Sequence, residues 1–319
     1  MKKLLVAIVI AALAAAAVLG FQWTATGPLT KDADIIVPRG ASLAATAVQL
    51  EDAGAIRSSD AFRLMARVLG TGAPIKAGEF RIPAGSSAAA ILRILQYGEP
   101  LQRLIVVPEG LPSILVHEKL MAEDLLTGEV DVPAEGSVLP GGYSFERGEP
   151  RAAVLTRMQE AMTKTLAELW AARKPSSVVK TPEEAVNLAA IVEKETAKAE
   201  ERRTIAGVYS NRLRIGMMLQ ADPTVIYPIT KGKPLGRRIR QSELRADNGY
   251  NTYAKAGLPT GPIANPGRAS IEAVLDPETT DALYFVADGT GGHVFARTLD
   301  EHNANVVKWR AIRRERGEL

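Results

Sequence analysis

The sequence predicts an α+β fold in three parts: an N-terminal transmembrane helix, a small α+β module and a larger α+β domain. Short strand-like segments, such as 35–38 and 78–82, alternate with segments in which apolar residues recur at helical spacing. Of the 319 residues, 46% are hydrophobic, which is enough for one or two domain cores in addition to an apolar N-terminal segment.

The N-terminal segment is predicted to be a membrane anchor. Lys2 and Lys3 precede an uncharged run of 18 residues, 4–21, and Trp23 follows it at the depth of a membrane interface. Basic residues before such a run predict a cytoplasmic N-terminus, with the remaining chain on the other side. A cleaved signal peptide is the alternative, because the run is alanine-rich and short. A retained anchor is favoured since no small-x-small cleavage site ends the run before Phe21.

The composition excludes several classes of protein. The net charge is only +3, with acidic and basic residues interspersed, which does not favour nucleic-acid binding. The absence of cysteine excludes disulfides, thiolate zinc sites and a cysteine nucleophile. His117, His293 and His302 are widely spaced and form no metal-ligand pattern. We therefore expect neither a metal nor a cofactor.

The chain is predicted to divide after residues 23, 34 and 99. Residues 1–23 are the cytoplasmic tip and anchor, 24–34 a linker, 35–99 the small module, and 100–319 an intermediate region with the larger domain. In the small module we expect helices at 42–53, 59–69 and 87–97 between and after the two strands. The larger region is expected to have a strand near 103–110, a turn at 139–142 and a long helix at 151–174.

A helix predicted over residues 182–199 carries the most informative residue of the chain. Thr181 is a capping residue and Pro182 suits the first helical position. At about 100° per residue, Glu195 falls within about 20° of the centre of an apolar stripe. That stripe consists of Leu188, Ile191, Val192 and Ala199.

Glu195 is the candidate general acid. Apolar neighbours disfavour the charged form of a carboxyl group and raise its pKa toward the range that an acid catalyst needs. Glu193 points well away from the stripe, so the two glutamates are not equivalent. The alternative is that this end of the helix is exposed and that Glu195 is one of several solvated charges.

After a helix predicted at 204–215, the chain is rich in aromatic, amide and turn residues. They lie at 220–227, 250–253, 257–259 and 263–267. Tyrosine and asparagine side chains can stack on sugars and hydrogen-bond their hydroxyls, so these segments could form a sugar-binding groove. Ordinary loops would have the same composition.

The C-terminal region predicts a hairpin. A strand at 282–287 is followed by glycine-rich residues and a second β-like segment that begins near His293. The glycine run lacks the lysine of a phosphate-binding loop and opens no helix. His293 is either a site residue or a hairpin residue, and His302 is interpreted as a packing or capping residue of the last helix.

Several strings resemble one known family. They are IVEKET at 191–196, NRLRIGM at 211–217, LQADPTVIY at 219–227, YNTY at 250–253, GLP at 257–259, GPI at 261–263, YFVA at 284–287 and GH at 292–293. In this order they are similar to the endolytic murein transglycosylases of the MltG/YceG-like family. The resemblance implies a single-pass inner-membrane protein with a periplasmic LysM-like module at 35–99 and a C-terminal catalytic domain.

The resemblance also implies an activity. In the family the catalytic residue is a glutamate of the EKET string, which is carried over to Glu195, the glutamate before Thr196. The implied lyase cleaves the β-1,4 bond between N-acetylmuramic acid and N-acetylglucosamine in nascent peptidoglycan strands, leaves 1,6-anhydro ends and terminates elongation. One carboxyl group can act first as acid and then as base, and the N-acetyl group would replace a second carboxylate.

Substrate contacts and partners follow from the same resemblance. The residues carried over as lining the glycan groove are Gln220, Tyr227, Asn251, Tyr253 and His293. Whether Asp222 or Glu193 assists catalysis stays open, because Asp222 equally suits a turn or helix cap. Peptidoglycan strands are the implied substrate, and peptidoglycan synthases are possible partners.

Two other functions are compatible with these residues. A noncatalytic peptidoglycan-binding scaffold of the cell-wall synthesis machinery would tolerate glutamine in place of Glu195. An ordinary muramidase would use a water nucleophile and differ only in its product ends.

Overall fold

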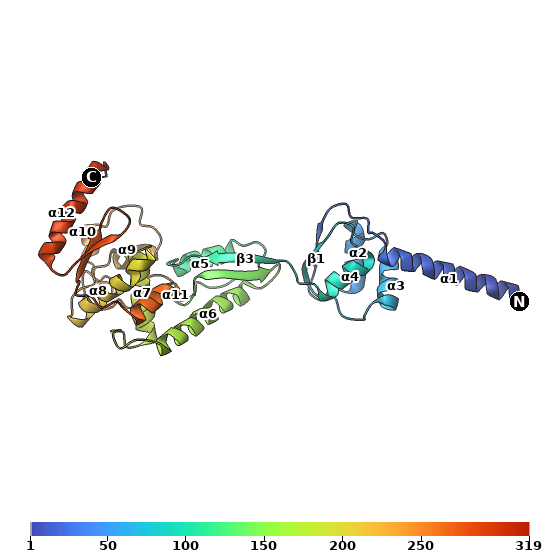
Figure 1. Ribbon diagram of the computed structural model, residues 1–319, viewed down its shortest axis with the longest axis horizontal. Coiled ribbons are helices and arrows are strands. Elements are labelled where there is room, and N and C mark those ends of the chain that lie inside the picture. The colour runs from blue at the N-terminus through green and yellow to red at the C-terminus, as the bar shows by residue number, and fades with distance from the viewer. Residues whose placement is uncertain (1, 319) are drawn as a thin grey trace. The chain divides into compact units, whose positions relative to one another are not determined.

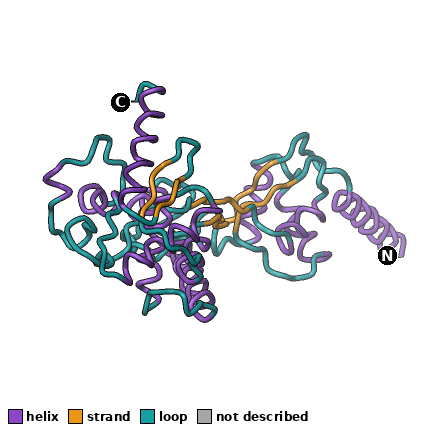
Figure 2. The backbone as a smooth tube through the Cα atoms, turned by 60° about the vertical axis from the view of Figure 1, so that its left-hand side comes forward, coloured by secondary structure: helices purple, strands orange, loops and turns teal. Residues whose placement is uncertain are grey.

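The computed structural model describes residues 2–318, apart from the side chains at 2–5, 7, 8, 11–13, 15 and 19. It confirms a mixed α+β fold, in which the described strands form three separate pairs (Figure 2). The chain divides into two compact units, which are described separately. The first contains Met1–Arg103 and Ser144–Glu149, and the second contains Leu104–Tyr143 and Pro150–Leu319.

The first unit is built on the antiparallel pair of β1 (Ala33–Val37) and β2 (Gly78–Ile82). Helices α2 (Leu43–Asp52) and α3 (Ser59–Leu69) connect the strands, and α4 (Ala88–Tyr97) follows β2. The side chains of Ser42, Ser58 and Ser87 cap the three helices by accepting backbone hydrogen bonds, as their residue type favours. Buried apolar residues of both strands and all three helices form one core. All five of these elements were predicted.

Helix α1 (Lys2–Thr24) packs against α3 and α4 in the same unit (Figure 1). Trp23 is buried in the core, with its ring centroid 5.9 Å from that of Phe62. Trp23 is therefore a core residue of the first unit, and its predicted depth at a membrane interface stays a prediction. Within the described residues, no helix has both the length and the apolar content of a membrane span. Met1, part of the predicted cytoplasmic tip, lies outside the described residues.

A further strand pair consists of β3 (Gln102–Val107) and β4 (Gly141–Glu146), and the division between the units passes through both strands. Strand β3 was predicted. Strand β4 was not, because its first two residues are glycines that were interpreted as part of a turn.

The second unit is mainly helical. Its helices are α5 (Ser113–Met121), α6 (Arg151–Ala171), α7 (Pro182–Glu195), the 3-10 helix η1 (Ala199–Glu201), α8 (Arg202–Arg214), α9 (Asp222–Thr230), α10 (Gln241–Leu244), α11 (Arg268–Leu275) and α12 (Leu299–Glu315). Strands β5 (Tyr284–Ala287) and β6 (His293–Ala296) form the predicted hairpin, which packs against α12. Helices α5, α9, α10 and α11 were not predicted as separate elements. They are short, and α9 contains two prolines that resemble turn residues.

Helix α7 lies at the centre of the second unit, in contact with α6, α8, α9 and α11 (Figure 1). Its start is as predicted, since the Thr181 hydroxyl accepts a hydrogen bond from the backbone of Glu184. Every residue from 185 to 192 is buried, so the prediction of a single apolar stripe was wrong. The predicted end was also wrong, because the backbone becomes extended at Thr196 and Ala199 lies exposed in η1.

Asn265 connects three segments of the second unit. Its side chain is fully buried, and Nδ2 donates to the carbonyl of Leu111 at 2.9 Å and to the hydroxyl of Ser113 at 3.0 Å. Oδ1 accepts a hydrogen bond from the backbone of Val138 at 3.0 Å. Because buried polar groups must be paired, this amide is a structural residue.

We expect Asn265→Ala to lower the free energy of unfolding by about 2–4 kcal/mol, because it leaves several buried polar groups without partners. Chemical denaturation measures this change. The control is Asn303→Ala on the exposed side of α12, which should change stability by no more than about 0.5 kcal/mol. Equal stability of the two variants would contradict the structural role.

Candidate active site

Glu195 is the last residue of α7 and keeps partial solvent exposure, whereas Val192 is fully buried. At the C-terminus of a helix, a carboxyl group faces the negative end of the helix dipole, which disfavours its charged form. The position therefore combines access from solvent with surroundings that favour a bound proton.

The protonation of Glu195 depends mainly on burial. The pKa of its carboxyl is raised from the ordinary 4.5 to about 7, chiefly by burial and to a smaller extent by the negative charge of Asp222. A hydrogen bond with the Tyr209 hydroxyl and the positive charge of Arg212 act in the opposite direction. The raised pKa predicted for Glu195 is thus confirmed. An acid with a pKa near 7 can hold a proton at neutral pH and still release it in a reaction.

Tyr209 of α8 holds the Glu195 carboxyl in place. Its ring is 1% exposed, and burial raises the pKa of its hydroxyl well above the usual range. The hydroxyl therefore stays protonated and can donate to Glu195. Phe285 of β5 packs edge-on against Tyr209, with the centroids 5.8 Å apart, which fixes the ring between the helix and the hairpin.

Arg212 lies one helical turn after Tyr209 on the same face of α8 and is 7% exposed. Its Nε donates to the carbonyl of Leu283 at 2.7 Å, and an Nη donates to that of Leu219 at 2.6 Å. A further bond of 3.5 Å reaches the carbonyl of Met218, and the guanidinium lies over the Tyr284 ring, 5.5 Å from its centroid. All of these partners are neutral, and among the described residues no ion pair joins Arg212 to Glu195.

Asp222 and Tyr253 form a second carboxyl–tyrosine pair near Glu195. The Tyr253 hydroxyl donates to Oδ1 of Asp222 at 2.6 Å. Burial, followed by this bond to Asp222, raises the pKa of the Tyr253 hydroxyl, so it stays a donor. Asp222 opens α9 and is exposed, as suits a carboxylate in the first turn of a helix.

Gln220 has a left-handed backbone, with φ of 53°, which is uncommon for a residue other than glycine. Its neighbours Leu219 and Ala221 are buried, and its own side chain is exposed. Thr252 supports this conformation: its carbonyl accepts from Gln220 N at 3.1 Å, and its hydroxyl accepts from Ala221 N at 3.0 Å. Such strain often occurs at functional sites. The predicted groove role of Gln220 is compatible with this exposure.

His293 lies at the start of β6 and is bound to Glu201 of η1. Nδ1 of His293 lies 2.8 Å from Oε2 of Glu201, and the backbone N–H of His293 donates to Oε1 at 2.9 Å. Glu201 also accepts from the hydroxyl of Thr196, the residue that follows Glu195, at 3.2 Å. This pair connects the hairpin to the end of α7, so His293 is a hairpin residue and also a neighbour of the site.

Two predicted groove residues, Asn251 and Tyr227, have structural contacts. The amide of Asn251 is buried and donates to three carbonyls in the segment 243–246. Tyr227 is 9% exposed, hydrogen-bonds the half-buried Glu135 and lies with its ring centroid 4.9 Å from that of Tyr250. Nothing in this geometry supports sugar contacts by either side chain.

Glu193 has a different environment from Glu195. Its carboxylate accepts a hydrogen bond from the backbone of Gly267 at 2.9 Å and lies 3.5 Å from Arg202. These contacts connect α7 to the residue before α11. The expected difference between the two glutamates is confirmed, and a catalytic role of Glu193 receives no support.

Sequence reasoning missed Tyr209, Arg212 and Glu201 as parts of the site. Tyr209 lies in the helix predicted at 204–215 without a role assigned to it, and Arg212 appears only as part of the string at 211–217. Their spacing of three residues on one helix was a usable signal. The sequence contained no such signal for Glu201, because its partner His293 is 92 residues away.

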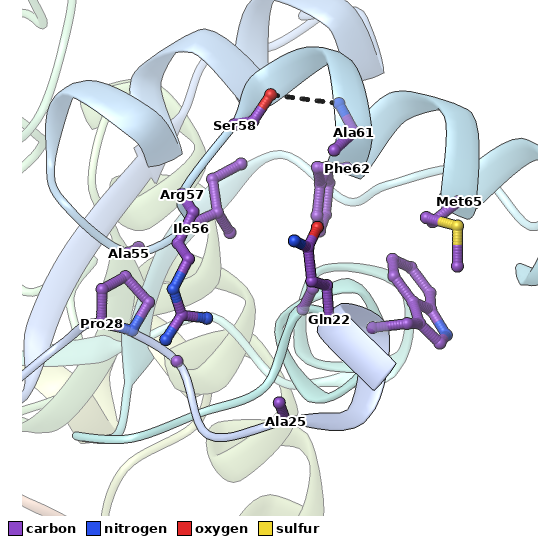
Figure 3. A pocket seen from close by; sticks show the side chains of 13 residues that line it. Gln22, Ala25, Pro28, Ala55, Ile56, Arg57, Ser58, Ala61, Phe62 and Met65 are labelled. Carbon is purple, nitrogen blue, oxygen red and sulfur yellow. Dashed lines mark hydrogen bonds between the residues drawn. The ribbon is translucent and has the colours of Figure 1, made fainter. Parts of the chain in front are cut away.

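The first unit contains a separate cavity of about 50 Å³ (Figure 3). Trp23, Ile56, Phe62 and Met65 line it together with Arg57. No carboxyl group lines this cavity, so it cannot supply the acid chemistry that Glu195 offers in the second unit. We interpret it as a gap in the packing between α1 and α3.

The fold and the site define an α+β protein whose larger unit presents a protonatable glutamate, hydrogen-bonded to a tyrosine, at the end of a buried helix. The model of the YceG-like family matches residues 35–308. The chain belongs to the YceG-like family.

Named relatives and a solved structure agree with this membership. An endolytic murein transglycosylase of Bacillus subtilis is 29% identical, over 91% of this chain and 89% of the relative. A protein of the same name from Streptococcus pneumoniae is 28% identical over 94% of this chain, which covers 63% of that longer relative. The crystal structure of a YceG-like protein from Listeria monocytogenes has 27% identity and a TM-score of 0.52, and the match covers 86% of this chain and 99% of that one.

The raised pKa of Glu195 predicts that the free energy of unfolding depends on pH. Between pH 4.5 and about 7 the folded protein binds this proton more tightly than the unfolded chain, so stability falls as the pH rises through that window. Glutamine has no ionisable carboxyl, so Glu195→Gln avoids the cost of a desolvated negative charge. The variant should therefore be more stable than the parent at pH 8, by at most about 3 kcal/mol, and by much less at pH 5. Denaturant unfolding at both pH values measures the difference.

The control for this prediction is Glu200→Gln, which removes an exposed carboxylate a few residues away. It should show no comparable gain at pH 8. If Glu195→Gln has the same stability as the parent at both pH values, the carboxyl is not desolvated as described.

Proposed function

We propose that the chain is an endolytic murein transglycosylase, a lyase that cleaves the MurNAc-β-1,4-GlcNAc bond within peptidoglycan strands. The observation that carries this proposal is Glu195: a partly exposed carboxyl with a pKa near 7, in a family whose named relatives have this activity. Its surroundings suit a general acid, and α7 and α8 fix its position.

The proposed reaction begins with proton transfer from Glu195 to the glycosidic oxygen as the bond from that oxygen to C1 of the muramic acid breaks. Tyr209 stays protonated and bonded to the carboxyl, which orients it. The N-acetyl group of the substrate assists departure at C1. No water is consumed, so the partly enclosed carboxyl needs no room for a bound nucleophilic water.

In the second step the Glu195 carboxylate accepts the proton of the muramic 6-hydroxyl while O6 bonds to C1. The product has a 1,6-anhydro end, and Glu195 is protonated again. Charges balance over the two steps, and one carboxyl group serves both. Cleavage of nascent strands in this way would terminate their elongation.

We also propose the location and the role of the first unit. The uncharged run at 4–21 after Lys2 and Lys3 would anchor the protein in the cell inner membrane, with the N-terminus in the cytoplasm and the catalytic unit in the periplasm. The β1–α2–α3–β2 order with an antiparallel strand pair supports a LysM-like module that binds glycan strands. Peptidoglycan synthases are proposed partners, because the substrate is their product.

The test is mass spectrometry of purified peptidoglycan digested by the full chain in detergent, compared with the same protein carrying Glu195→Gln. We expect 1,6-anhydro ends from the parent and a loss of at least about 100-fold in the variant, since general acid catalysis contributes about 10²–10⁴-fold. Glu200→Gln is the matched control, because it changes an exposed glutamate a few residues away.

Three other results would contradict this proposal. Reducing ends would indicate a muramidase with a water nucleophile. Binding to peptidoglycan without cleavage by the parent would favour a noncatalytic scaffold. Equal losses of cleavage activity in the two glutamine variants would show that Glu195 is not the catalytic acid.

A further inference from the structure

Glu201 accepts three hydrogen bonds from two parts of the chain that meet beside the site. The ring of His293 lies with Nδ1 2.8 Å from Oε2 of Glu201, and the backbone N–H of His293 donates to Oε1 at 2.9 Å. The third donor is the hydroxyl of Thr196, 3.2 Å from Oε2. Thr196 directly follows Glu195, so a single peptide bond separates this cluster from the candidate acid.

The Glu201 carboxylate is enclosed and charged. The side chains of Glu201 and His293 are 14% and 15% exposed. Burial by itself raises the pKa of the Glu201 carboxyl, but the hydrogen bonds from His293 and Thr196 lower it below its ordinary value. A charged acceptor forms stronger hydrogen bonds than a neutral one, so the negative charge strengthens all three contacts.

The hydroxyl of Thr196 is bonded on both sides. Thr196 is 5% exposed, and its backbone leaves α7 in an extended conformation, with φ of −140° and ψ of 138°. The hydroxyl donates to Glu201 and accepts from the backbone N–H of Lys198 at 3.0 Å. Helix ends often fray, and these two bonds hold the end of α7 against the segment 198–201.

Phe285 gives the C-terminal hairpin a second route to the acid. Its ring packs edge-on against His293, with the centroids 5.2 Å apart, and edge-on against Tyr209 at 5.8 Å. Tyr209 is the residue whose hydroxyl bonds to Glu195. The hairpin is therefore connected to the backbone beside the acid through Glu201, and to the carboxyl through two aromatic rings.

Gly292 leaves the space that the Glu201 carboxylate occupies. A Cβ at this position would overlap Oε1 of Glu201 and lie 2.6 Å from Nζ of Lys198. The φ of Gly292 is outside the left-handed region, so alanine would meet a steric conflict there without backbone strain. To relieve the conflict, the carboxylate would have to move away from His293.

We infer that Glu201 is a positioning residue of the site: by binding Thr196 and His293 together, it fixes the end of α7 and with it the Glu195 carboxyl. This inference rests on the proposed function. Glu201 exchanges no proton in the reaction and acts through position, since the charges that act on the Glu195 proton are those of Asp222 and Arg212.

The first test compares Thr196→Val with Thr196→Ser. Valine keeps the shape of threonine but lacks the hydroxyl, whereas serine keeps the hydroxyl. In cleavage of soluble peptidoglycan strands by the full chain in detergent, Thr196→Val should lower kcat about 10- to 100-fold and change KM by no more than about 2-fold, because a misplaced catalytic group loses rate more than binding. Thr196→Ser should keep most of the parental kcat.

The second test measures the Glu195 pKa and needs no substrate. Titration of the Glu195 carboxyl carbon by 13C NMR should give a lower pKa in Glu201→Gln and in Thr196→Val than in the parent, because a displaced carboxyl is better solvated. Thr196→Val changes no charge, so a fall in that variant has a positional cause. Glu200→Gln removes the exposed carboxylate next to Glu201 and is the matched control, with parental kcat and titration.

Two further variants test whether these contacts act as one unit. Gly292→Ala leaves Glu201, Thr196 and His293 in the chain but displaces the carboxylate, so it should reproduce the kcat loss of Glu201→Gln. Thr196→Val combined with Glu201→Gln should lose little more kcat than Glu201→Gln alone, because both changes break the same hydrogen bond. Additive losses would contradict a shared role.

The outcomes separate this inference from the proposed function. A Thr196→Val variant with the parental kcat and the parental Glu195 titration overturns the inference, even if Glu195→Gln abolishes cleavage. Equal kcat losses in Thr196→Val and Thr196→Ser, with unchanged titration, also overturn it and assign Thr196 a merely structural role. A parent without cleavage overturns the proposed function, whereas a lowered Glu195 pKa in Thr196→Val would still support the positioning by Glu201.

Discussion

The site depends on one constraint: the Glu195 carboxyl is placed where protein surrounds most of it, and it is bonded to a tyrosine that cannot ionise. Desolvation is the largest influence on its pKa, larger than any single charge nearby. Helix α7 creates this environment because it is buried along most of its length and ends at the glutamate itself. A glutamate one turn earlier, at the position of Ile191 or Val192, would be inaccessible to solvent.

The elements around α7 supply the remaining features of the site. Helix α8 contributes Tyr209 as a donor and Arg212 as a charge fixed by backbone carbonyls. The C-terminal hairpin contributes Phe285 and His293, and Glu201 connects that hairpin to Thr196 directly after the acid. The positions that carry the chemistry are thus set by packing between segments distant in sequence. A substitution at any of these positions should therefore alter the environment of the Glu195 carboxyl.

The loop segments have two kinds of role, which their composition did not distinguish. Asn251 and Asn265 use their amides to satisfy buried backbone groups, as their burial requires. Gln220, Asp222 and Tyr253 remain closer to solvent around Glu195. Amide and aromatic residues suit both tasks equally well, and only the fold decides which residues face inward.

The sequence by itself determined the α+β class, the five elements β1, α2, α3, β2 and α4 of the first unit, the start of α7 and the different environments of Glu193 and Glu195. Those features depend on local signals: caps, helical periodicity and short strings of residues. Tertiary structure alone decided that α7 is enclosed on all sides, that it ends at Glu195, and that Trp23 belongs to a core. It also decided the contacts of Tyr209, Arg212, Asp222 and His293, because each requires segments far apart in the chain to meet, and sequence spacing carries no distance between them.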